Sequence, residues 1–209
     1  MTYTIRQMEK GDLAQISEID QEAFPSQWPP PNYRQELQNR LAHYLVAIDD
    51  TRTAAEAGAK SSSKQSRLAT WLAPLLKPLR SREESPSRYT RQYIVGFSGI
   101  WMMVDEAHIT NIAVSQPYRR RGIGELLLIA TIDLALELKA STMTLEVRAS
   151  NIPAQKLYSK YGFVEMGIRQ GYYLDNRENA IIMSTENITS ASFQAHIQQL
   201  RESLANKLI

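Results

Sequence analysis

The chain has 209 residues, 43% of them hydrophobic and 22% charged, with a formal net charge of +2 at pH 7. It is long enough to bury one full core, and so small a net charge gives no argument for nucleic-acid binding by the chain as a whole. The absence of cysteine excludes disulfides and cysteine metal sites and fits a cytoplasmic location. Because the sequence has no long apolar run, we expect no secretory signal and no membrane-spanning helix.

The N-terminal quarter of the chain predicts alternating strands and helices. Apolar residues at helical spacing follow a short β-branched segment, and several prolines then break the chain around Trp28. The predicted elements are a strand over residues 2–6, a helix over 13–24, a helix over 33–41 and a strand over 43–48.

Residues 51–91 have the composition of a flexible basic insertion. Between residues 50 and 92 there are nine Lys or Arg and four Asp or Glu, a net charge of +5. Leucines and Trp71 within residues 68–79 form a short amphipathic stripe flanked by bases. One interpretation is contact with a membrane surface or ribosomal RNA. The other is an irregular loop packed on the protein itself, which Pro74 and Pro78 favour because they shorten any helix.

The remaining chain alternates strands with helices. Periodicity predicts one bent or two short strands over 93–104, strands over 108–115, 142–147, 163–169 and 180–185, and helices over 122–139, 153–161 and 190–208. The helix over 122–139 is apolar almost all round, which predicts that it is largely buried. The three histidines stand at no metal-ligand spacing, so no metal site is expected.

The loop between residues 115 and 125 has the pattern of a diphosphate-binding site. Three arginines, Arg119, Arg120 and Arg121, precede a helix that opens with Gly122 and Gly124. The first N–H groups of a helix have no partner within it, and the helix dipole adds positive charge there. Glycine lets a phosphate approach the backbone closely.

Two further side chains are candidates for proton transfer. Alternation along residues 142–147 places Glu146 opposite the apolar face of its strand, and Tyr158 lies on the helix that follows. A surface glutamate and a packing aromatic are the alternative interpretations.

Residues 108–173 resemble the Gcn5-related N-acetyltransferase (GNAT) superfamily, which binds acetyl-coenzyme A. The resemblance rests on Asn-Ile-Ala-Val at 111–114, the Arg-x-x-Gly-x-Gly loop at 119–124, Leu-Glu-Val-Arg-Ala-Ser-Asn at 145–151 and Leu-Tyr-x-x-Tyr-Gly-Phe at 157–163. The third of these blocks, with Gly-Tyr-Tyr at 171–173, is similar to the bacterial ribosomal-protein alanine N-acetyltransferases.

The resemblance implies an α/β GNAT fold with one mixed, mostly antiparallel sheet flanked by helices. The sheet is expected to splay between the strand ending at Val114 and the strand beginning at Thr142. The N-acetyltransferase domain is expected over residues 1–188, with the insertion at 51–91, and an additional amphipathic helix over residues 189–209.

The resemblance also implies roles for individual residues. Glu146 would be the general base and Tyr158 the general acid in a direct transfer. The residues expected to bind acetyl-coenzyme A are Ile112, Ala113, Val114, Arg119, Arg120, Arg121, Gly122, Ile123, Gly124, Glu125 and Asn151. The walls of a peptide groove are expected to include Trp28, Tyr172 and Tyr173, although the two tyrosines are equally explained as packing aromatics.

The function implied is acetylation of a protein N-terminal α-amine, with the N-terminal alanine of a small-subunit ribosomal protein as substrate. The basic insertion adds the expectation of a weak contact with ribosomal RNA. One alternative keeps the fold and acetylates a small-molecule amine or a lysine side chain. Another is a non-catalytic coenzyme A-binding or ribosome-associated module, against which the presence of both Glu146 and Tyr158 argues.

Overall fold

The computed structural model describes residues 3–26, 31–53 and 92–208. They form one seven-stranded sheet in the order β1-β2-β3-β4-β5-β7-β6. Its only parallel pair is β4 with β5, so the predicted mixed, mostly antiparallel sheet is confirmed. The strands are β1 Tyr3–Gln7, β2 Ala42–Thr53, β3 Gln92–Met103, β4 Glu106–Val114, β5 Thr142–Arg148, β6 Phe163–Tyr173 and β7 Glu178–Thr185.

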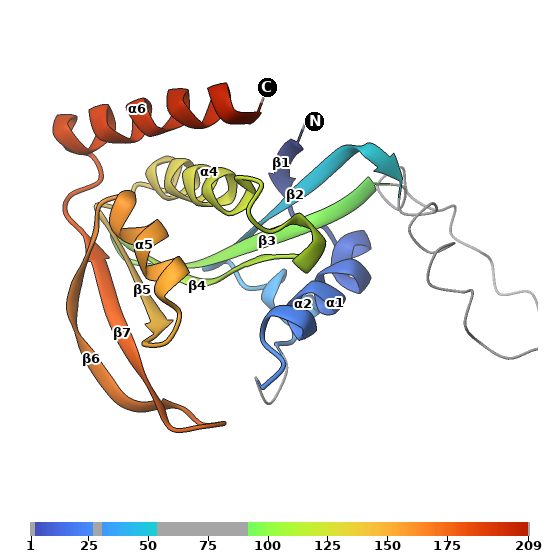
Figure 1. Ribbon diagram of the computed structural model, residues 1–209, viewed down its shortest axis with the longest axis horizontal. Helices are drawn as coiled ribbons and strands as arrows, with labels where there is room; N and C mark the ends of the chain where they lie inside the picture. The colour runs from blue at the N-terminus through green and yellow to red at the C-terminus, as the bar shows by residue number, and fades with distance from the viewer. Residues whose placement is uncertain (1–2, 27–30, 54–91, 209) are drawn as a thin grey trace, which may run out of the picture.

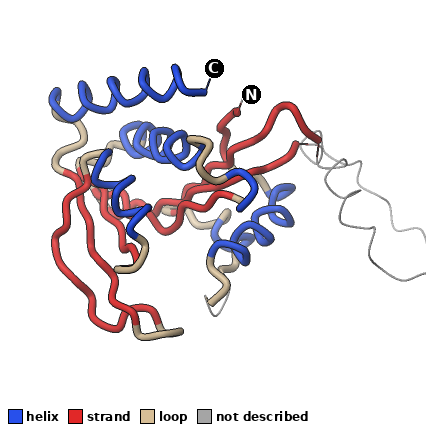
Figure 2. Tube along the Cα trace, viewed as in Figure 1, coloured by secondary structure: helices blue, strands red, loops and turns tan. Residues whose placement is uncertain are grey.

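Helices cover both faces of the sheet (Figures 1 and 2). On one face α4, α5 and α6 bury their apolar side chains with the strands, and on the other face α1 and α2 form a second core against β2 and β3. The helices are α1 Leu13–Ala23, α2 Tyr33–Glu36, α4 Ile123–Glu137, α5 Ile152–Lys160 and α6 Ala191–Leu208, with short 3-10 turns η1 Lys10–Asp12 and η4 Gln116–Tyr118.

The helix predicted over residues 33–41 is wrong in length, because α2 ends at Glu36. The chain is drawn into the sheet instead. The Leu41 carbonyl accepts a hydrogen bond from the Met102 N–H at 2.8 Å, and Ala42 pairs with Trp101 of β3. These strand contacts replace the last turn of the expected helix.

Two strands extend several residues past their predicted ends. The strand β2 runs to Thr53, three residues into the predicted insertion, where Thr53 pairs with Gln92 of β3. Residues 54–91, including the amphipathic stripe, lie outside the described residues. The strand β6 continues past Arg169 to Tyr173, with two irregularities in its pairing with β7. Local propensity did not predict this extension because hydrogen bonds to β7 stabilise it.

The sheet splays where the sequence predicted. The strands β4 and β5 pair only between Glu106 and Ile109 on one strand and Thr142 and Leu145 on the other. The rest of β4 pairs with β3 alone, and the rest of β5 pairs with β7 alone. The facing edges of β4 and β5 are therefore unpaired with each other from Thr110 and Glu146 onward.

The C-terminal helix α6 packs on α4, which is why α4 tolerates apolar residues on most of its surface. Phe193, Ile197 and Leu204 of α6 are buried in the same core as α4. An ion pair between Arg201 and Asp133, at 2.7 Å, links the two helices. In the part of the chain that the structure describes, no helix is long and apolar enough to cross a membrane.

Candidate active site

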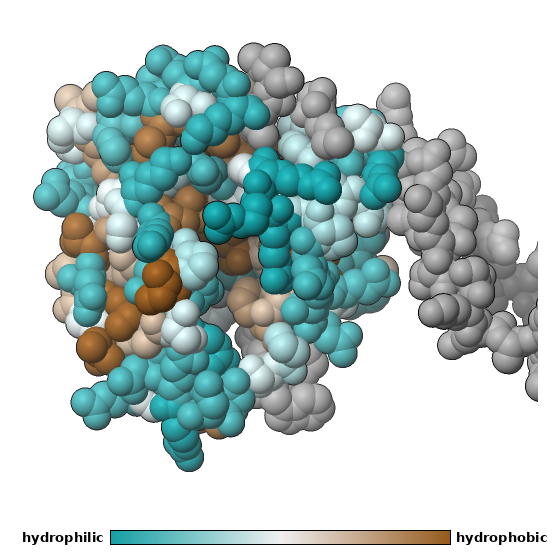
Figure 3. Space-filling model, in the orientation of Figure 1, coloured by the Kyte–Doolittle hydropathy of each residue, from teal (hydrophilic) through white to brown (hydrophobic). Residues whose placement is uncertain are grey.

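A cavity of about 860 Å³ opens at the splay between β4 and β5. Strands β4 and β5 and helix α5 line its inner part, while the end of α1 and the β6–β7 hairpin form two opposite walls. Figure 3 shows the molecule hollowed between these two sides. Of the predicted site residues, those that line the cavity are Ile112, Glu146, Asn151, Tyr158, Tyr172 and Tyr173.

Glu146 points into this cavity from the middle of β5. Alternate β5 residues are buried, so the predicted apolar face packs on the core and Glu146 faces the opposite way. Its side chain is only 9% exposed, and both carboxylate oxygens have a cationic or ionisable partner. His108 Nε2 lies 3.1 Å from Oε2, and Arg169 Nη2 lies 3.1 Å from Oε1.

His108 belongs to a hydrogen-bonded chain that ends at Glu146. The Thr144 hydroxyl donates to the Glu106 carboxylate at 2.6 Å, so it accepts from His108 Nδ1–H at 2.9 Å. On the other side of the ring, His108 Nε2 faces Glu146 Oε2 and completes the chain. Sequence reasoning missed His108 because its place beside Glu146 depends on the parallel pairing of His108 with Thr144.

Tyr158 lines the same cavity, and its phenol is protonated, as a proton donor must be. Its side chain is buried and packs on Phe163, with ring centroids 5.7 Å apart. Burial, and to a smaller extent the nearby Tyr173, raises the pKa of Tyr158 well above its usual value. The phenol therefore keeps its proton at neutral pH.

The predicted diphosphate loop precedes α4. Gly122 is the N-cap of α4 with φ of 84°, a left-handed conformation that glycine adopts without strain. Arg119 Nε donates to the Val114 carbonyl at 3.0 Å, which ties the loop to the end of β4. The Arg121 guanidinium lies 5.0 Å from the centre of the Tyr118 ring.

Several predicted cofactor residues can contribute only through their backbone, or have side chains engaged elsewhere. The side chains of Ala113 and Ile123 are buried in the core. The Glu125 carboxylate accepts from Lys160 and from the Tyr161 hydroxyl. Asn151 is the N-cap of α5 and accepts from the Ala154 N–H at 3.3 Å. Trp28 lies outside the described residues.

The two predicted groove tyrosines lie next to each other on the cavity wall. Tyr172 and Tyr173 contact edge to face, with ring centroids 5.2 Å apart. Arg169 lies over Tyr172 at 5.6 Å from its ring centre, and Arg148 lies over Tyr173 at 3.8 Å. Burial is the main cause that raises the pKa of Tyr173 to about 12, so this phenol is also protonated at neutral pH.

Comparison with known proteins agrees with this geometry. A model of the acetyltransferase (GNAT) family matches residues 13–163. A Bacillus subtilis protein, provisionally named ribosomal protein bS18-alanine N-acetyltransferase, is 33% identical over 180 residues, which cover 86% of this chain and 92% of that protein. The Escherichia coli K12 ribosomal protein bS18-alanine N-acetyltransferase is 44% identical over 93 residues, 44% of this chain and 63% of that protein.

A solved structure extends the likeness to the whole fold. The crystal structure of the ribosomal-protein-S18-alanine N-acetyltransferase from Escherichia coli superposes with a TM-score of 0.64 at 28% identity, covering 91% of this chain and 96% of that one. The family match, the splayed sheet and the glycine at the start of α4 agree, and the chain belongs to the GNAT family of acetyltransferases.

Proposed function

We propose that this protein transfers the acetyl group of acetyl-coenzyme A to the α-amine of a protein N-terminus, the N-terminal alanine of a small-subunit ribosomal protein. The proposal rests on one observation: the carboxylate of Glu146 and the protonated phenol of Tyr158 line the same cavity at the splay of the sheet. The names of the Bacillus subtilis and Escherichia coli relatives support the choice of substrate. Such a substrate implies a cytoplasmic reaction.

Acetyl-coenzyme A fits the backbone groups near the splay. The edge of β4 beyond Ile109 is not paired with β5, so residues 112–114 can offer backbone groups to an extended pantetheine arm. The N–H groups of the first turn of α4 and the arginines at 119–121 would hold the diphosphate. Asn151 would contact the arm from the start of α5. When bound, acetyl-coenzyme A supplies an activated acetyl thioester.

Glu146 and Tyr158 would move one proton each. An α-ammonium group has a pKa of about 7.7–8.0, so a single proton must leave before the amine can attack. Arg169 occupies Glu146 Oε1 with a side chain that is 54% exposed, and the incoming ammonium replaces it there. Glu146 takes one proton from the ammonium, directly or through water, and the amine would then attack the thioester carbonyl. As the carbon–sulfur bond breaks, Tyr158 Oη gives its proton to the departing sulfur, and the second nitrogen proton, lost as the amide forms, restores the phenol. Without cysteine, the chain performs the transfer directly.

A comparison of amine substrates tests the proposal. The protein is incubated with acetyl-coenzyme A and, separately, a peptide beginning Ala-Arg-Tyr, the same peptide with a blocked N-terminus and an internal lysine, and free polyamines. Acetylation of the free α-amine at the highest kcat/KM is expected. Acetylation of only the lysine peptide or the polyamines contradicts the proposal, and turnover of none of them favours a non-catalytic binding module.

We further propose that the basic insertion contributes a weak contact with ribosomal RNA, on the basis of its net charge of +5 between residues 50 and 92. Thr53 pairs with Gln92, so a short Gly-Ser turn can replace residues 54–91 without changing the register of β2 and β3. This deletion is expected to lower kcat/KM on assembled ribosomal subunits, in a salt-dependent way, but not on the free peptide. Equal loss on both substrates contradicts the RNA contact.

A further inference from the structure

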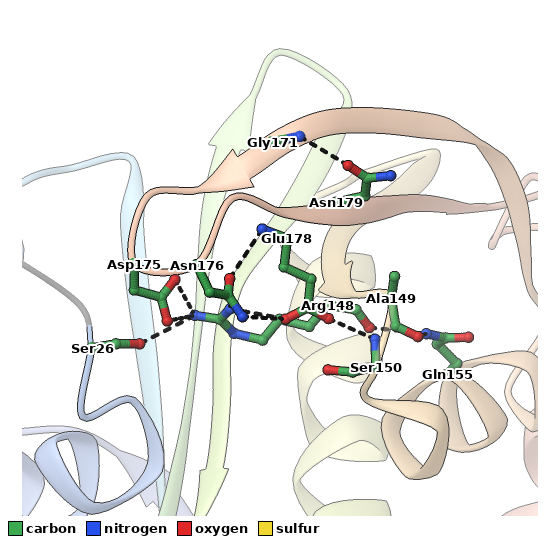
Figure 4. A network of polar contacts seen from close by, with 10 residues as sticks. All are labelled: Ser26, Arg148, Ala149, Ser150, Gln155, Gly171, Asp175, Asn176, Glu178 and Asn179. Atoms are coloured by element: carbon green, nitrogen blue, oxygen red, sulfur yellow. Dashed lines mark hydrogen bonds and ion pairs between the residues drawn. The ribbon is translucent and has the colours of Figure 1, made fainter.

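We propose that Arg148 is a positioning residue that clamps the two walls of the peptide groove together and thereby sets the affinity for the substrate's N-terminal segment. This inference rests on the proposed function. One wall is the end of α1 with the following residues 24–26, and the other is the β6–β7 hairpin, residues 172–178. The guanidinium of Arg148 contacts both walls (Figure 4).

The position of Arg148 follows from the strand alternation that also places Glu146. Arg148 is two residues further along β5, so its side chain leaves the sheet on the same side as Glu146 and lines the same cavity. Its side chain is 28% exposed. The base and the proposed clamp therefore come from one short strand.

On the hairpin side the guanidinium is held by several acceptors. Nη2 lies 3.0 Å from both oxygens of Asp175, and Nη1 lies 3.1 Å from Glu178 Oε2 and 3.3 Å from Asn176 Oδ1. The plane of the group lies against Tyr173. A planar fork with five N–H donors can satisfy all these partners at once, and a lysine ammonium cannot.

Neighbouring bonds fix both the hairpin and the strand that carries Arg148. Glu178 Oε1 accepts from the Ser150 N–H at 2.7 Å, and Gln155 Nε2 donates to the carbonyls of Arg148 and Ala149 at 2.9 Å each. At the hairpin's base, the Gly171 N–H donates to Asn179 at 2.9 Å. These hydrogen bonds fix the guanidinium of Arg148 against the hairpin, independently of its contact with the other wall.

The contact with the other wall comes from Ser26. Arg148 Nη2 donates to Ser26 Oγ at 3.2 Å, joining residues 122 positions apart in the chain. The Ser26 hydroxyl, followed by Arg148, also lowers the pKa of Asp175, so the three side chains form one unit across the groove. Loss of Arg148 would leave only the contact between Ser26 and Asp175 to join the two walls.

A purely electrostatic role and a positioning role of Arg148 predict opposite changes in peptide affinity when the residue is replaced. Replacing Arg148 by a neutral residue leaves Asp175 and Glu178 without their cation and makes the groove more negative. If Arg148 acted only through charge, a cationic peptide N-terminus would then bind more tightly. If Arg148 positions the walls, the same peptide binds less tightly, and lysine does not restore binding although it restores the charge.

The test measures kcat and both KM values with a peptide beginning Ala-Arg-Tyr, for wild type, Arg148→Gln, Arg148→Lys and Ser26→Ala. Both Arg148 variants are expected to raise the peptide KM about tenfold, with less change in kcat and none in the KM for acetyl-coenzyme A. Ser26→Ala raises the peptide KM less, and its effect in combination with Arg148→Gln is less than additive, because the two residues share one contact. The charge-matched control is Arg40→Gln, an exposed residue outside the lining of the cavity, which leaves both KM values unchanged.

Three outcomes overturn the inference. These are a peptide KM that stays unchanged or falls in Arg148→Gln, a lysine variant that matches wild type, and a drop in kcat alone, which would assign Arg148 to the chemistry instead. Ser26→Ala keeps the test valid if an Arg148 variant does not fold. A wild type that acetylates no peptide N-terminus refutes the proposed function together with this inference, whereas an active wild type with an unaffected Arg148→Gln refutes the inference alone.

Discussion

Glu146 is a nearly buried carboxylate at the splay of the sheet, and both His108 and Arg169 contact it. The alternation of residues 142–147 predicted the direction of its side chain. His108 was not predicted, because a histidine 38 positions earlier reaches Glu146 only through the pairing of β4 with β5.

The substitution Glu146→Gln keeps the size of the side chain, but the amide cannot accept the amine proton. We expect kcat for the α-amine substrate to fall about 100- to 1000-fold with little change in melting temperature. Steady-state kinetics and thermal unfolding measure the two effects. Glu165→Gln, an exposed glutamate of β6, is the matched control and should keep the wild-type kcat. A Glu146→Gln protein with wild-type kcat would remove Glu146 from the role of base.

Tyr158→Phe tests the proton donor. Removing the hydroxyl should lower kcat about 100-fold, because the sulfur leaves without a proton. Since burial raises the pKa of Tyr158, the wild-type log kcat should also show no decline from loss of this proton up to about pH 10, the usual tyrosine pKa. Tyr93→Phe serves as the control. An unchanged kcat in Tyr158→Phe would contradict the assignment.

At the scale of elements, the start of α4 depends on one backbone conformation. Gly122→Ala places a Cβ at φ of 84°, which costs about 1–2 kcal/mol in an L-residue. We expect a lower free energy of unfolding in urea and a higher KM for acetyl-coenzyme A, because the first N–H groups of α4 shift. Gly167→Ala is the control, since a Cβ there meets nothing within 4 Å. Equal effects of both substitutions would contradict this account.

The β6–β7 hairpin makes stability depend on pH through Glu178. Hydrogen bonds from Ser150 and then from Arg148 lower the pKa of Glu178 to about 2, from its usual value of 4.5. A depressed folded-state pKa stabilises the fold above pH 4.5, and this contribution is lost as the pH falls from 4.5 towards 2. Glu178→Gln should therefore have a lower melting temperature than wild type at neutral pH.

The difference in melting temperature between wild type and Glu178→Gln should shrink as the pH falls through that interval. Thermal unfolding at a series of pH values measures it. Glu186→Gln, an exposed glutamate after β7, is the control and should follow the wild-type curve. A difference that stays constant with pH would mean that Glu178 acts through packing rather than through its charge.

At the scale of the whole molecule, the single sheet carries one core on each face, and α6 completes the core over α4. Ile197 of α6 is 2% exposed and is absent from the lining of the cavity. Ile197→Ala should lower the free energy of unfolding by about 2–4 kcal/mol, through lost burial and the cavity that remains. Its kcat well below the melting temperature should stay near the wild-type value.

Urea unfolding and steady-state kinetics test this separation of stability from activity. Gln199→Ala, on the exposed side of α6, is the control and should change neither quantity. Loss of kcat in folded Ile197→Ala would show that α6 influences the active site, and unchanged stability would show that α6 is not part of the core.

Local sequence patterns were sufficient to predict most strands and helices, the direction of Glu146 in β5 and the glycine at the start of α4. Periodicity and glycine report on burial and backbone conformation within one element, so these features are encoded locally. Three features became visible only in the folded molecule: His108 contacts Glu146, Arg148 reaches Ser26, and β6 extends to Tyr173. These features depend on strand pairing and on contacts between residues far apart in the chain, which no local pattern specifies.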